Sequence, residues 1–386
     1  MPINSFVCPI CGNNDIHSIG YLNGKPYCRR CISFRGKEAD EPVIEPKNAD
    51  ITLNYRLSKE QKTLSRQLVQ NFKDGKNSLV KAVCGSGKTE IILSLIRYSI
   101  KNGYKVGFAC PRRDVIIELY YRFKNIFVNN KITVIYGGHT EELEGDLICM
   151  TTHQLFRYKN YFDLLIMDEI DAFPYKGDEL LEIFFKRAIK GNYVLLSATP
   201  DDKFVAQFIN EGGNLLELYT RFHKHPLPVP KIKTGMMLTL LYFLINQVKE
   251  FLKQNKPVFI FTPTIELCES IFNLLRLFIK NGNYVHSKHP HRSKIIDDFR
   301  NGKYMYLVTT AVLERGVTIK NLQVIIYRAD HQIYDRYSLV QISGRVGRKA
   351  DAPEGEVIYL AKRVNEEMAK SIEDIERANK TLQKLL

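Results

Sequence analysis

The sequence has no apolar run long enough to cross a bilayer. Its longest apolar stretch covers residues 236–245, is interrupted by Thr239 and is followed by Asn246 and Lys249, whereas a membrane-spanning helix needs about 20 apolar residues. The N-terminus also lacks a basic segment followed by an apolar one, so we expect no signal peptide. These absences predict a cytosolic protein, in which thiols stay reduced and disulfides are not expected.

The composition also lacks the biases that mark disorder, collagen or long coiled coils. Hydrophobic residues make up 45% and charged residues 25% of the 386 positions, as in ordinary globular proteins. A chain of this length holds two or three domains.

Charge is distributed unevenly along the chain. The net charge is +14, yet residues 1–51 are neutral, with six basic and six acidic residues, while residues 221–386 hold 27 basic and 16 acidic ones. A basic surplus favours a polyanionic partner, either nucleic acid or an acidic membrane surface. Charge alone does not choose between the two.

Four of the eight cysteines form one pattern near the N-terminus. Cys8 and Cys11 make a first C-x2-C pair, and Cys28 and Cys31 make a second. This spacing supplies four thiolates for a tetrahedral Zn²⁺, and Asn23-Gly24 predicts a hairpin turn between the pairs. A disulfide pair or a redox CxxC site are the alternatives, but the compartment and the lack of a surrounding βαβ pattern argue against them. We expect one structural zinc in a module at residues 1–40, followed by a linker at 41–51.

A glycine-bearing loop follows a short apolar strand at residues 79–82. It reads Ala82-Val83-Cys84-Gly85-Ser86-Gly87-Lys88-Thr89. Backbone amides of such a loop cradle phosphates, Lys88 reaches the β- and γ-phosphates, and the Thr89 hydroxyl binds Mg²⁺. Ala82 replaces the first glycine of the general motif.

A second segment places carboxylates at the end of an apolar strand. Residues 162–167 lead into Asp168-Glu169-Ile170-Asp171. In a phosphate-loop ATPase the first carboxylate coordinates Mg²⁺, and we assign this role to Asp168. Glu169 is then positioned to orient and deprotonate the attacking water.

A third strand, at residues 193–196, leads into Ser197-Ala198-Thr199-Pro200. Small hydroxyl residues after a buried strand can carry hydrogen bonds from the nucleotide site to a second domain. These three segments resemble motifs I, II and III of superfamily 2 helicases, in which alanine is usual at the position of Ala82. Residues 257–264, 307–317 and 341–348 resemble motifs IV, V and VI.

The resemblance narrows to the ComFA family, the late-competence ATPases of Gram-positive bacteria. It rests on the four-cysteine module ahead of the motifs, on Thr-Thr-Ala-Val-Leu-Glu-Arg-Gly-Val-Thr at 309–318 and on Gly-Arg-Val-Gly-Arg-Lys-Ala-Asp at 344–351. It implies an α/β fold of two RecA-like domains with parallel sheets behind the zinc module. Domain 1 would cover residues 52–223 with motifs I, Ia, II and III. Domain 2 would cover 224–386 with motifs IV, V and VI and a C-terminal helix, after a proline-rich linker at 225–230.

The same resemblance implies a nucleotide site for ATP and Mg²⁺. Glutamine upstream of motif I reads adenine in such helicases, which points to Gln61, although an exposed N-capped helix residue is the alternative. Arg345 and Arg348 lie three apart and would share one face of a helix, from which both could reach the γ-phosphate. The expected catalytic residues are Lys88, Asp168, Glu169, Gln341, Arg345 and Arg348; the expected ATP contacts are Gln61, Cys84, Gly85, Ser86, Gly87, Lys88 and Thr89; the expected coupling residues are Asp171, Ser197, Thr199 and Gly316.

Contacts to a nucleic-acid strand are expected from both domains. Most candidates are hydroxyls, backbone amides or single cations, which suit a grip on the backbone without sequence choice. In domain 1 they are Arg112, Arg113, Gly138, Thr151, Thr152 and His153, and in domain 2 Thr262, Thr264, Thr309 and Thr310.

The tail from Asn365 predicts a helix with an apolar stripe that includes Met368, Ile372, Ile375 and Leu382. Packing on domain 2 is favoured over a partner helix.

The function implied is a DNA-dependent ATPase that translocates on single-stranded DNA during natural transformation. Competence proteins at the uptake channel would be its partners, and they would bring a cytoplasmic protein to the inner face of the cell membrane. The alternatives are a duplex-unwinding helicase for replication restart or repair, an RNA helicase, since a backbone grip does not choose the sugar, and a nucleic-acid scaffold with a vestigial ATPase.

Overall fold

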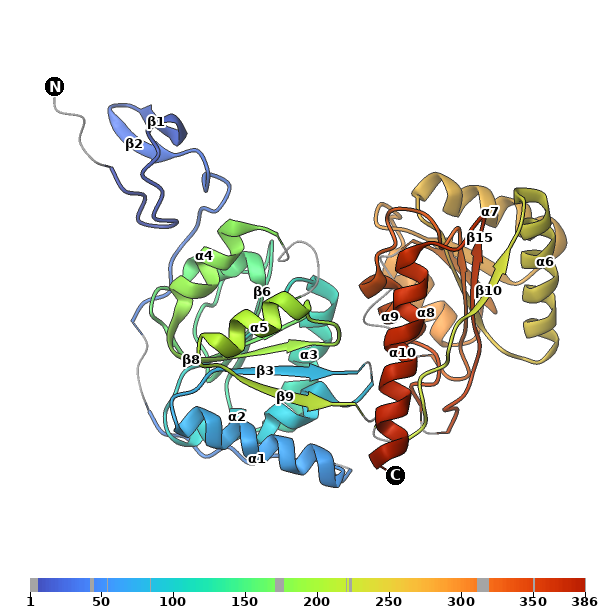
Figure 1. The fold of residues 1–386 in the computed structure, drawn as a ribbon. Coiled ribbons are helices and arrows are strands. Elements are labelled where there is room, and N and C mark those ends of the chain that lie inside the picture. Colours follow the sequence, from blue (N-terminus) through green and yellow to red (C-terminus); the bar gives the residue numbers. More distant parts are fainter. Residues whose placement is uncertain are drawn as a thin grey trace. The chain divides into compact units, whose positions relative to one another are not determined.

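The computed structural model describes residues 6–41, 45–53, 55–83, 85–170, 177–219, 221, 224–310, 319–349 and 351–385. The chain divides into two compact units (Figure 1). Unit 1 comprises residues 1–81 and 88–217, and unit 2 comprises residues 82–87 and 218–386. The domain boundaries expected from the sequence stay predictions.

Unit 1 begins with the four-cysteine module. A short 3-10 helix, η1 (Ile16–Ser18), leads into an antiparallel hairpin of β1 (Ile19–Leu22) and β2 (Lys25–Cys28). Asn23 and Gly24 both have positive φ, at 49° and 74°, which is the backbone that a two-residue hairpin turn requires. The predicted turn is therefore confirmed.

Seven strands form the sheet in the described part of unit 1, in the order β5-β6-β4-β7-β8-β3-β9. Neighbours from β5 through β3 run parallel. The bounds are β3 Ser78–Ala82, β4 Val106–Cys110, β5 Ile132–Ile135, β6 Leu147–Thr151, β7 Phe162–Asp168, β8 Ile189–Ser197 and β9 Asn214–Leu218. The strands expected before motifs I, II and III are confirmed as β3, β7 and β8.

Helices cover both faces of this sheet, as parallel strands require. They are α1 (Lys59–Lys73), α2 (Lys88–Lys101), α3 (Arg113–Ile126), α4 (Glu179–Ala188) and α5 (Asp202–Asn210), with a 3-10 helix, η2 (Thr152–Arg157), after β6. One face buries Met150, Leu165 and Met167 against Phe184 of α4 and Phe208 of α5. On the other face Phe108 packs edge-on against Phe123 of α3, with 5.5 Å between ring centroids.

Unit 2 contains a six-stranded sheet in its described part, in the order β10-β15-β14-β11-β13-β12, and all its pairings are parallel. The α/β class with parallel sheets is thus confirmed in both units. The bounds are β10 Lys231–Thr234, β11 Val258–Phe261, β12 Gly282–Val285, β13 Tyr306–Thr309, β14 Gln323–Tyr327 and β15 Val357–Ala361.

Alternate residues of these strands separate two cores in unit 2. Phe259 and Ile326 face a cluster with α8 (Arg292–Arg300), α9 (Arg336–Ser343) and α10 (Glu366–Leu385). Ile260 and Ile325 face a second cluster with α6 (Met237–Lys253) and α7 (Ile265–Phe278). Period-2 alternation therefore leaves both faces of the central strands β11, β13, β14 and β15 apolar and buried.

Helix α10 is the predicted C-terminal helix, and it packs on unit 2. Met368, Ile375 and Leu382 are buried, and Arg336 of α9 pairs with Asp374. Packing within the chain, rather than a partner helix, is confirmed for this stripe. Among the described residues, the longest apolar helices fall short of what a bilayer crossing needs.

Candidate nucleotide, zinc and strand sites

Residues 82–87 join β3 to α2, and two glycines give this loop its shape. Gly85 and Gly87 have φ of +81° and +86°, a backbone conformation that glycine adopts without strain. Loops of this kind, followed directly by a helix N-terminus, bind phosphate through backbone amides. The expected phosphate loop therefore has glycine at both of these positive-φ positions. Cys84 lies outside the described residues.

Lys88, the first residue of α2, is paired with the first carboxylate of motif II. Its Nζ lies 3.4 Å from Oδ1 of Asp168, and both side chains are mostly buried. Asp168 is the last residue of β7 and also accepts a 2.8 Å hydrogen bond from the backbone N–H of Glu169. The geometry therefore joins motifs I and II in unit 1, although they are 80 positions apart in sequence.

Glu169 has an unusual backbone for a non-glycine residue. Its φ is +60°, and its N–H is also within 3.0 Å of the carbonyl oxygen of Leu196 in β8. A carboxylate oxygen of Glu169 lies 3.9 Å from Nε of Arg112. Non-glycine residues with a left-handed backbone cluster at functional sites, and Glu169 directly follows Asp168.

Motif III follows the strand next to motif II. Asp168 pairs with Leu196 in the parallel register of β7 and β8, so Ser197 comes directly after the position beside Asp168. Ser197 is fully buried, and its hydroxyl accepts a 3.0 Å hydrogen bond from the N–H of Thr199. The proposed coupling residue Asp171 lies outside the described residues, as do residues 311–318 of motif V, which include Gly316.

The residues present fit a magnesium ion bound with nucleotide. Asp168 offers carboxylate oxygens at a strand end, and Thr89 offers a hydroxyl in the first turn of α2. Carboxylate and hydroxyl oxygens, completed by phosphate and water, are the ligands that Mg²⁺ takes in such sites.

Motif VI begins in α9 but its arginines do not lie on that helix. Gln341 is a buried residue of α9, whereas the helix ends at Ser343. Gly344 caps it, and Gly347 has φ of +67°. The expectation that Arg345 and Arg348 share one helical face is therefore wrong: Arg345 lies in the turn at residues 344–347, and Arg348 comes directly after it, because Gly347 in the left-handed region turns the chain away from the helix.

Arg221, which belongs to none of the sequence motifs, holds this turn. It is 2% exposed, and its guanidinium donates hydrogen bonds of 2.9, 2.9 and 3.0 Å to the carbonyl oxygens of Val346, Gly347 and Gly344. A lone arginine between β9 and the proline-rich linker has no sequence signal that predicts such a role.

Gln61 is buried rather than exposed. It forms a capping box with Ser58 at the start of α1, in which its side-chain oxygen accepts a 2.9 Å hydrogen bond from the Ser58 N–H. The alternative of an exposed helix residue is thus excluded, and adenine recognition by Gln61 stays a prediction.

The strand candidates of unit 1 differ in exposure. Arg113 is exposed and its guanidinium lies 4.4 Å from the centroid of the Tyr136 ring, and Gly138 forms the turn after it with φ of +84°. Thr151 and Thr152 are buried at the end of β6. His153 follows in η2, where burial lowers the pKa of its imidazole below the ordinary 6.5 and nearby Asp178 partly opposes this.

The strand candidates of unit 2 are buried threonines and one helix cap. Thr262 is fully buried and donates a 3.2 Å hydrogen bond to the Thr309 carbonyl oxygen. Thr309 donates to the carbonyl oxygen of Thr310 at 3.1 Å. The Thr264 hydroxyl caps α7 by accepting from the Leu267 N–H at 3.2 Å. Any contact from Thr262 or Thr309 would therefore be through the main chain.

The four cysteines of the N-terminal module converge as expected. Their sulfurs all lie within 4.8 Å of one another, with Cys8 and Cys31 3.4 Å apart and Cys11 and Cys28 3.6 Å apart. Tetrahedral zinc with Zn–S bonds of about 2.3 Å needs sulfurs about 3.8 Å apart, so this donor set fits Zn²⁺. Burial raises the pKa of the Cys11 thiol to about 11, so protons compete with the metal and its binding releases them.

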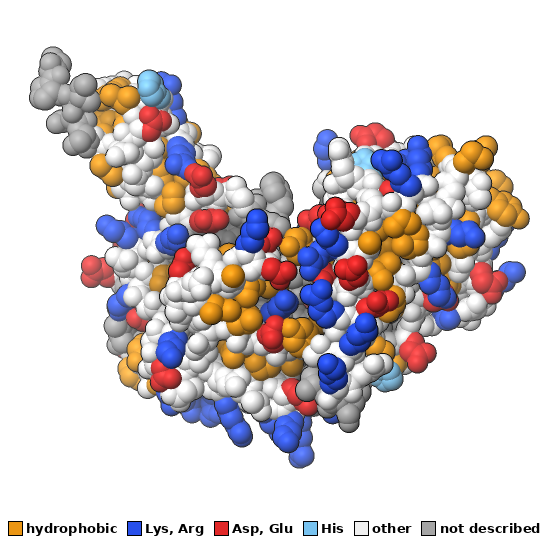
Figure 2. All heavy atoms as spheres, in the orientation of Figure 1, with side chains coloured by type: hydrophobic (Ala, Val, Ile, Leu, Met, Phe, Trp, Pro, Cys, Tyr) orange, Lys and Arg blue, Asp and Glu red, His pale blue; other side chains and the backbone are white. Residues whose placement is uncertain are grey.

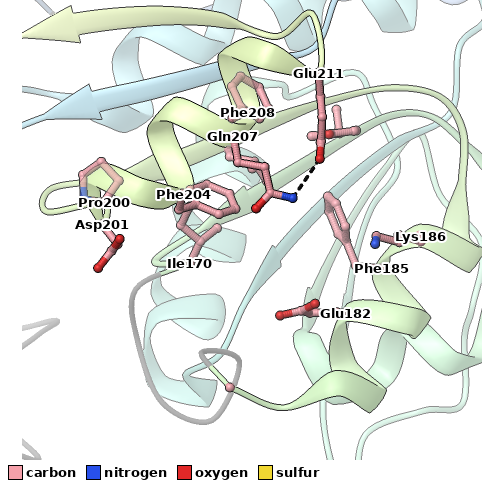
Figure 3. Close-up of a pocket in the computed structure, with 13 residues that line it drawn as sticks. Ile170, Glu182, Phe185, Lys186, Pro200, Asp201, Phe204, Gln207, Phe208 and Glu211 are labelled. Carbon is pink, nitrogen blue, oxygen red and sulfur yellow. Dashed lines mark hydrogen bonds between the residues drawn. The ribbon is translucent and has the colours of Figure 1, made fainter.

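A cavity of about 370 Å³ lies beside motifs II and III (Figure 3). Phe185 of α4 and Phe204 and Phe208 of α5 line it, together with Ile170, which follows Glu169, and Pro200, which follows Thr199. The lining also includes the charged side chains of Glu182, Lys186, Asp201 and Glu211, so the cavity beside the two motifs is of mixed aromatic and polar character.

Two family descriptions match the chain. "Type III restriction enzyme, res subunit" matches residues 54–202, and "Helicase conserved C-terminal domain" matches residues 242–350. These ranges hold motifs I to III and IV to VI respectively.

Curated relatives match almost the whole chain. Competence protein ComFA of Bacillus subtilis (strain 168) is 32% identical over 92% of this chain and 81% of its own length. Competence protein ComFA of Streptococcus pneumoniae (strain ATCC BAA-255 / R6) is 32% identical over 97% of this chain and 90% of its own.

The fold is shared with a solved structure. S. cerevisiae Dbp5 bound to RNA and ADP BeF3 superposes with a TM-score of 0.62 at 16% identity, over 86% of this chain and 98% of that one. The likeness supports a RecA-like fold for the two parallel sheets.

Proposed function

The chain belongs to the ComFA family, and from this premise we propose that it is an ATP-driven motor that moves along single-stranded DNA and drives its uptake during natural transformation. The helicase-type ATPase class follows from the family and from the two matching descriptions, of a helicase C-terminal domain and of a type III restriction enzyme res subunit. The proposal adds three things: the substrate is single-stranded DNA, movement along it drives uptake, and the protein works at a particular place in the cell. That place is the cytoplasm at the inner face of the cell membrane, reached through competence proteins at the uptake channel.

The single observation that carries the ATPase chemistry is the Lys88–Asp168 pair at 3.4 Å. The phosphates of a bound nucleotide would be ligands of Mg²⁺, and Thr89 and Asp168 would be its ligands from the protein. Lys88 would then leave Asp168 and bind the β- and γ-phosphates. Glu169, on its left-handed backbone, would orient the attacking water and take its proton.

Arginines of unit 2 would complete the reaction. Arg345 lies in the turn that Arg221 holds and Arg348 directly follows it, and positive charge near the γ-phosphate stabilises the transition state by about 10³–10⁵ in rate. Gln341 would contact the γ-phosphate or the attacking water. Coupling through Ser197 and Thr199 would link this step to the grip on the strand.

The test is ATP turnover with single-stranded DNA, duplex DNA and RNA as separate stimulants. We expect single-stranded DNA to stimulate most. Stimulation by RNA above DNA would favour an RNA helicase, and a preference for forked duplex with strand separation would favour a repair helicase. No stimulation by any of them would leave a scaffold with a vestigial ATPase.

Site variants test the catalytic assignment. Lys88→Ala and Glu169→Gln should each lower turnover by at least about 100-fold, and Glu169→Gln should still bind ATP. Lys62→Ala is the matched control, since Lys62 is an exposed lysine on α1. Turnover that survives in either site variant would refute the site.

A further inference from the structure

The segment that leaves the zinc module is packed against elements far along the chain. The ring of Phe34 stacks on His153 of η2, with 6.2 Å between centroids and 14° between planes. It also meets Phe156 of η2 at 5.9 Å and Phe184 of α4 at 4.8 Å, both edge-on. One side chain from the module thus contacts both η2 and α4.

Backbone hydrogen bonds fix the same segment on η2. Ala39 donates to the carbonyl oxygen of Arg157 at 2.9 Å, and the Arg157 guanidinium donates to the carbonyl oxygen of Lys37 at 2.7 Å. Arg157 is 7% exposed, and its Nε also donates to Gln154 at 2.7 Å. These bonds use buried groups, so the segment is held in one place on η2.

Ion pairs extend the contact to α4. Arg187 of α4 pairs with Glu38 at 2.9 Å and also donates to the carbonyl oxygens of Phe156 and Tyr158. Arg30, between the second pair of cysteines, pairs with Glu179 at the start of α4. The zinc module therefore bridges η2 and α4.

Both η2 and α4 adjoin segments with a proposed function in the chain. Helix η2 begins with Thr152 and His153, at the expected strand contacts, and α4 is the first described helix after motif II. The module at residues 1–40 carries five basic and three acidic residues, a net charge of only +2, whereas the surplus of +11 lies in residues 221–386. So small a net charge is a weak basis for a direct grip on phosphates.

We propose that Phe34 is a positioning residue through which the zinc module holds η2 and α4 in register, and so sets the affinity for single-stranded DNA. The module then acts on the strand through the Thr151–His153 segment rather than by contacting DNA itself. This inference rests on the proposed function, because it takes single-stranded DNA as the ligand.

The first test measures binding of a fluorescent oligo(dT) by anisotropy, without ATP hydrolysis. Phe34→Ala should weaken binding by about threefold to tenfold, because each lost aromatic contact is worth about a factor of ten at most. Phe34→Tyr keeps the ring and should restore affinity. Tyr21→Ala, which removes an aromatic ring that is 68% exposed on β1, should bind like the unmodified chain.

The opposite ranking would overturn the inference. If Tyr21→Ala weakens binding and Phe34→Ala does not, the module contacts the strand directly. If Phe34→Ala weakens binding but Phe34→Tyr does not restore it, stacking is not the cause.

The second test uses the reciprocity of coupled sites. If the module and the strand segment are coupled through Phe34, oligo(dT) should raise the equilibrium affinity for zinc, measured by competition with a colorimetric chelator. That gain should disappear in Phe34→Ala, while metal analysis still gives one zinc per chain. Equal zinc affinities with and without DNA in the unmodified chain would refute the coupling.

A third variant covers the case in which Phe34→Ala loses its zinc. Glu38→Gln removes only the pair with Arg187 and leaves the aromatic contacts in place. It should weaken oligo(dT) binding in the same direction but less, and an unchanged affinity would refute the inference. Failure of the proposed function is distinct from these outcomes, since it appears as the absence of single-strand stimulation in the unmodified chain.

Discussion

At the scale of single residues, the site depends on backbone conformations that few residues tolerate. Glu169 has a φ of +60°, which costs about 1–2 kcal/mol for a residue with a side chain. The hydrogen bonds from its N–H to Asp168 and Leu196 offset this cost. Gly347 after α9 has a similar φ of +67°. Neighbouring atoms in addition fill the space that a Cβ at Gly347 would occupy.

Gly347→Ala should destabilise the chain and impair turnover together. A Cβ at this position would overlap the carbonyl oxygen of Pro353, which adds about 1–3 kcal/mol of overpacking to about 1–2 kcal/mol of backbone strain. Gly302→Ala is the matched control, because Gly302 has φ of +77° with open space around it. Urea unfolding should give a larger loss of unfolding free energy for Gly347→Ala, and equal losses would contradict the steric argument.

At the scale of elements, the end of α9 decides where the motif VI arginines lie. The helix stops at Ser343, and the turn that follows is held by three hydrogen bonds from Arg221. Planar guanidinium donors suit a set of converging carbonyl oxygens better than an ammonium does. Arg221 therefore positions the turn that carries Arg345 and directly precedes Arg348.

Arg221→Met should lower kcat for ATP by about tenfold or more, since small displacements of catalytic groups have effects of this size. It should also lower the free energy of unfolding by about 2–4 kcal/mol, from three lost hydrogen bonds. Arg363→Met, at an exposed arginine, is the control and should change neither quantity. An Arg221→Met chain with unchanged kcat would refute the positioning role.

At the scale of the whole molecule, the basic surplus lies in residues 221–386, at +11 of the total +14. On the face of unit 2 seen in Figure 2, blue Lys and Arg side chains are interspersed with red acidic ones rather than gathered in one patch. The proposed grip on a strand from such a surface would be made of separate phosphate contacts, each of which would release counterions.

Arg113→Ala should reduce the salt dependence of oligo(dT) binding. For single strands each phosphate contact contributes a slope of about −0.7 in log K against log salt, so the slope should become shallower by about that amount. Arg66→Ala, at another exposed arginine of unit 1, is the control. Equal slopes for the two variants would remove Arg113 from the strand contacts.

Local spacing is what the sequence determined about this protein. The four zinc ligands, the glycines of the phosphate loop and the strand before Asp168 depend on residues within a few positions of one another, so their patterns could be recognised directly. The α/β class with parallel sheets was implied by the resemblance that these motifs carry. The family followed from these motifs and their order.

Packing between distant segments is what only the tertiary structure decided. Arg221 meets carbonyls more than 120 positions away, and Phe34 meets His153 and Phe184, because folding stacks elements that no local pattern connects. The end of α9 before Arg345 had a local signal in Gly344 and Gly347, but the hydrogen bonds from Arg221 that hold the following turn come only from the fold. Which side chains share a site depends on how elements pack, and that information lies in contacts rather than in spacing.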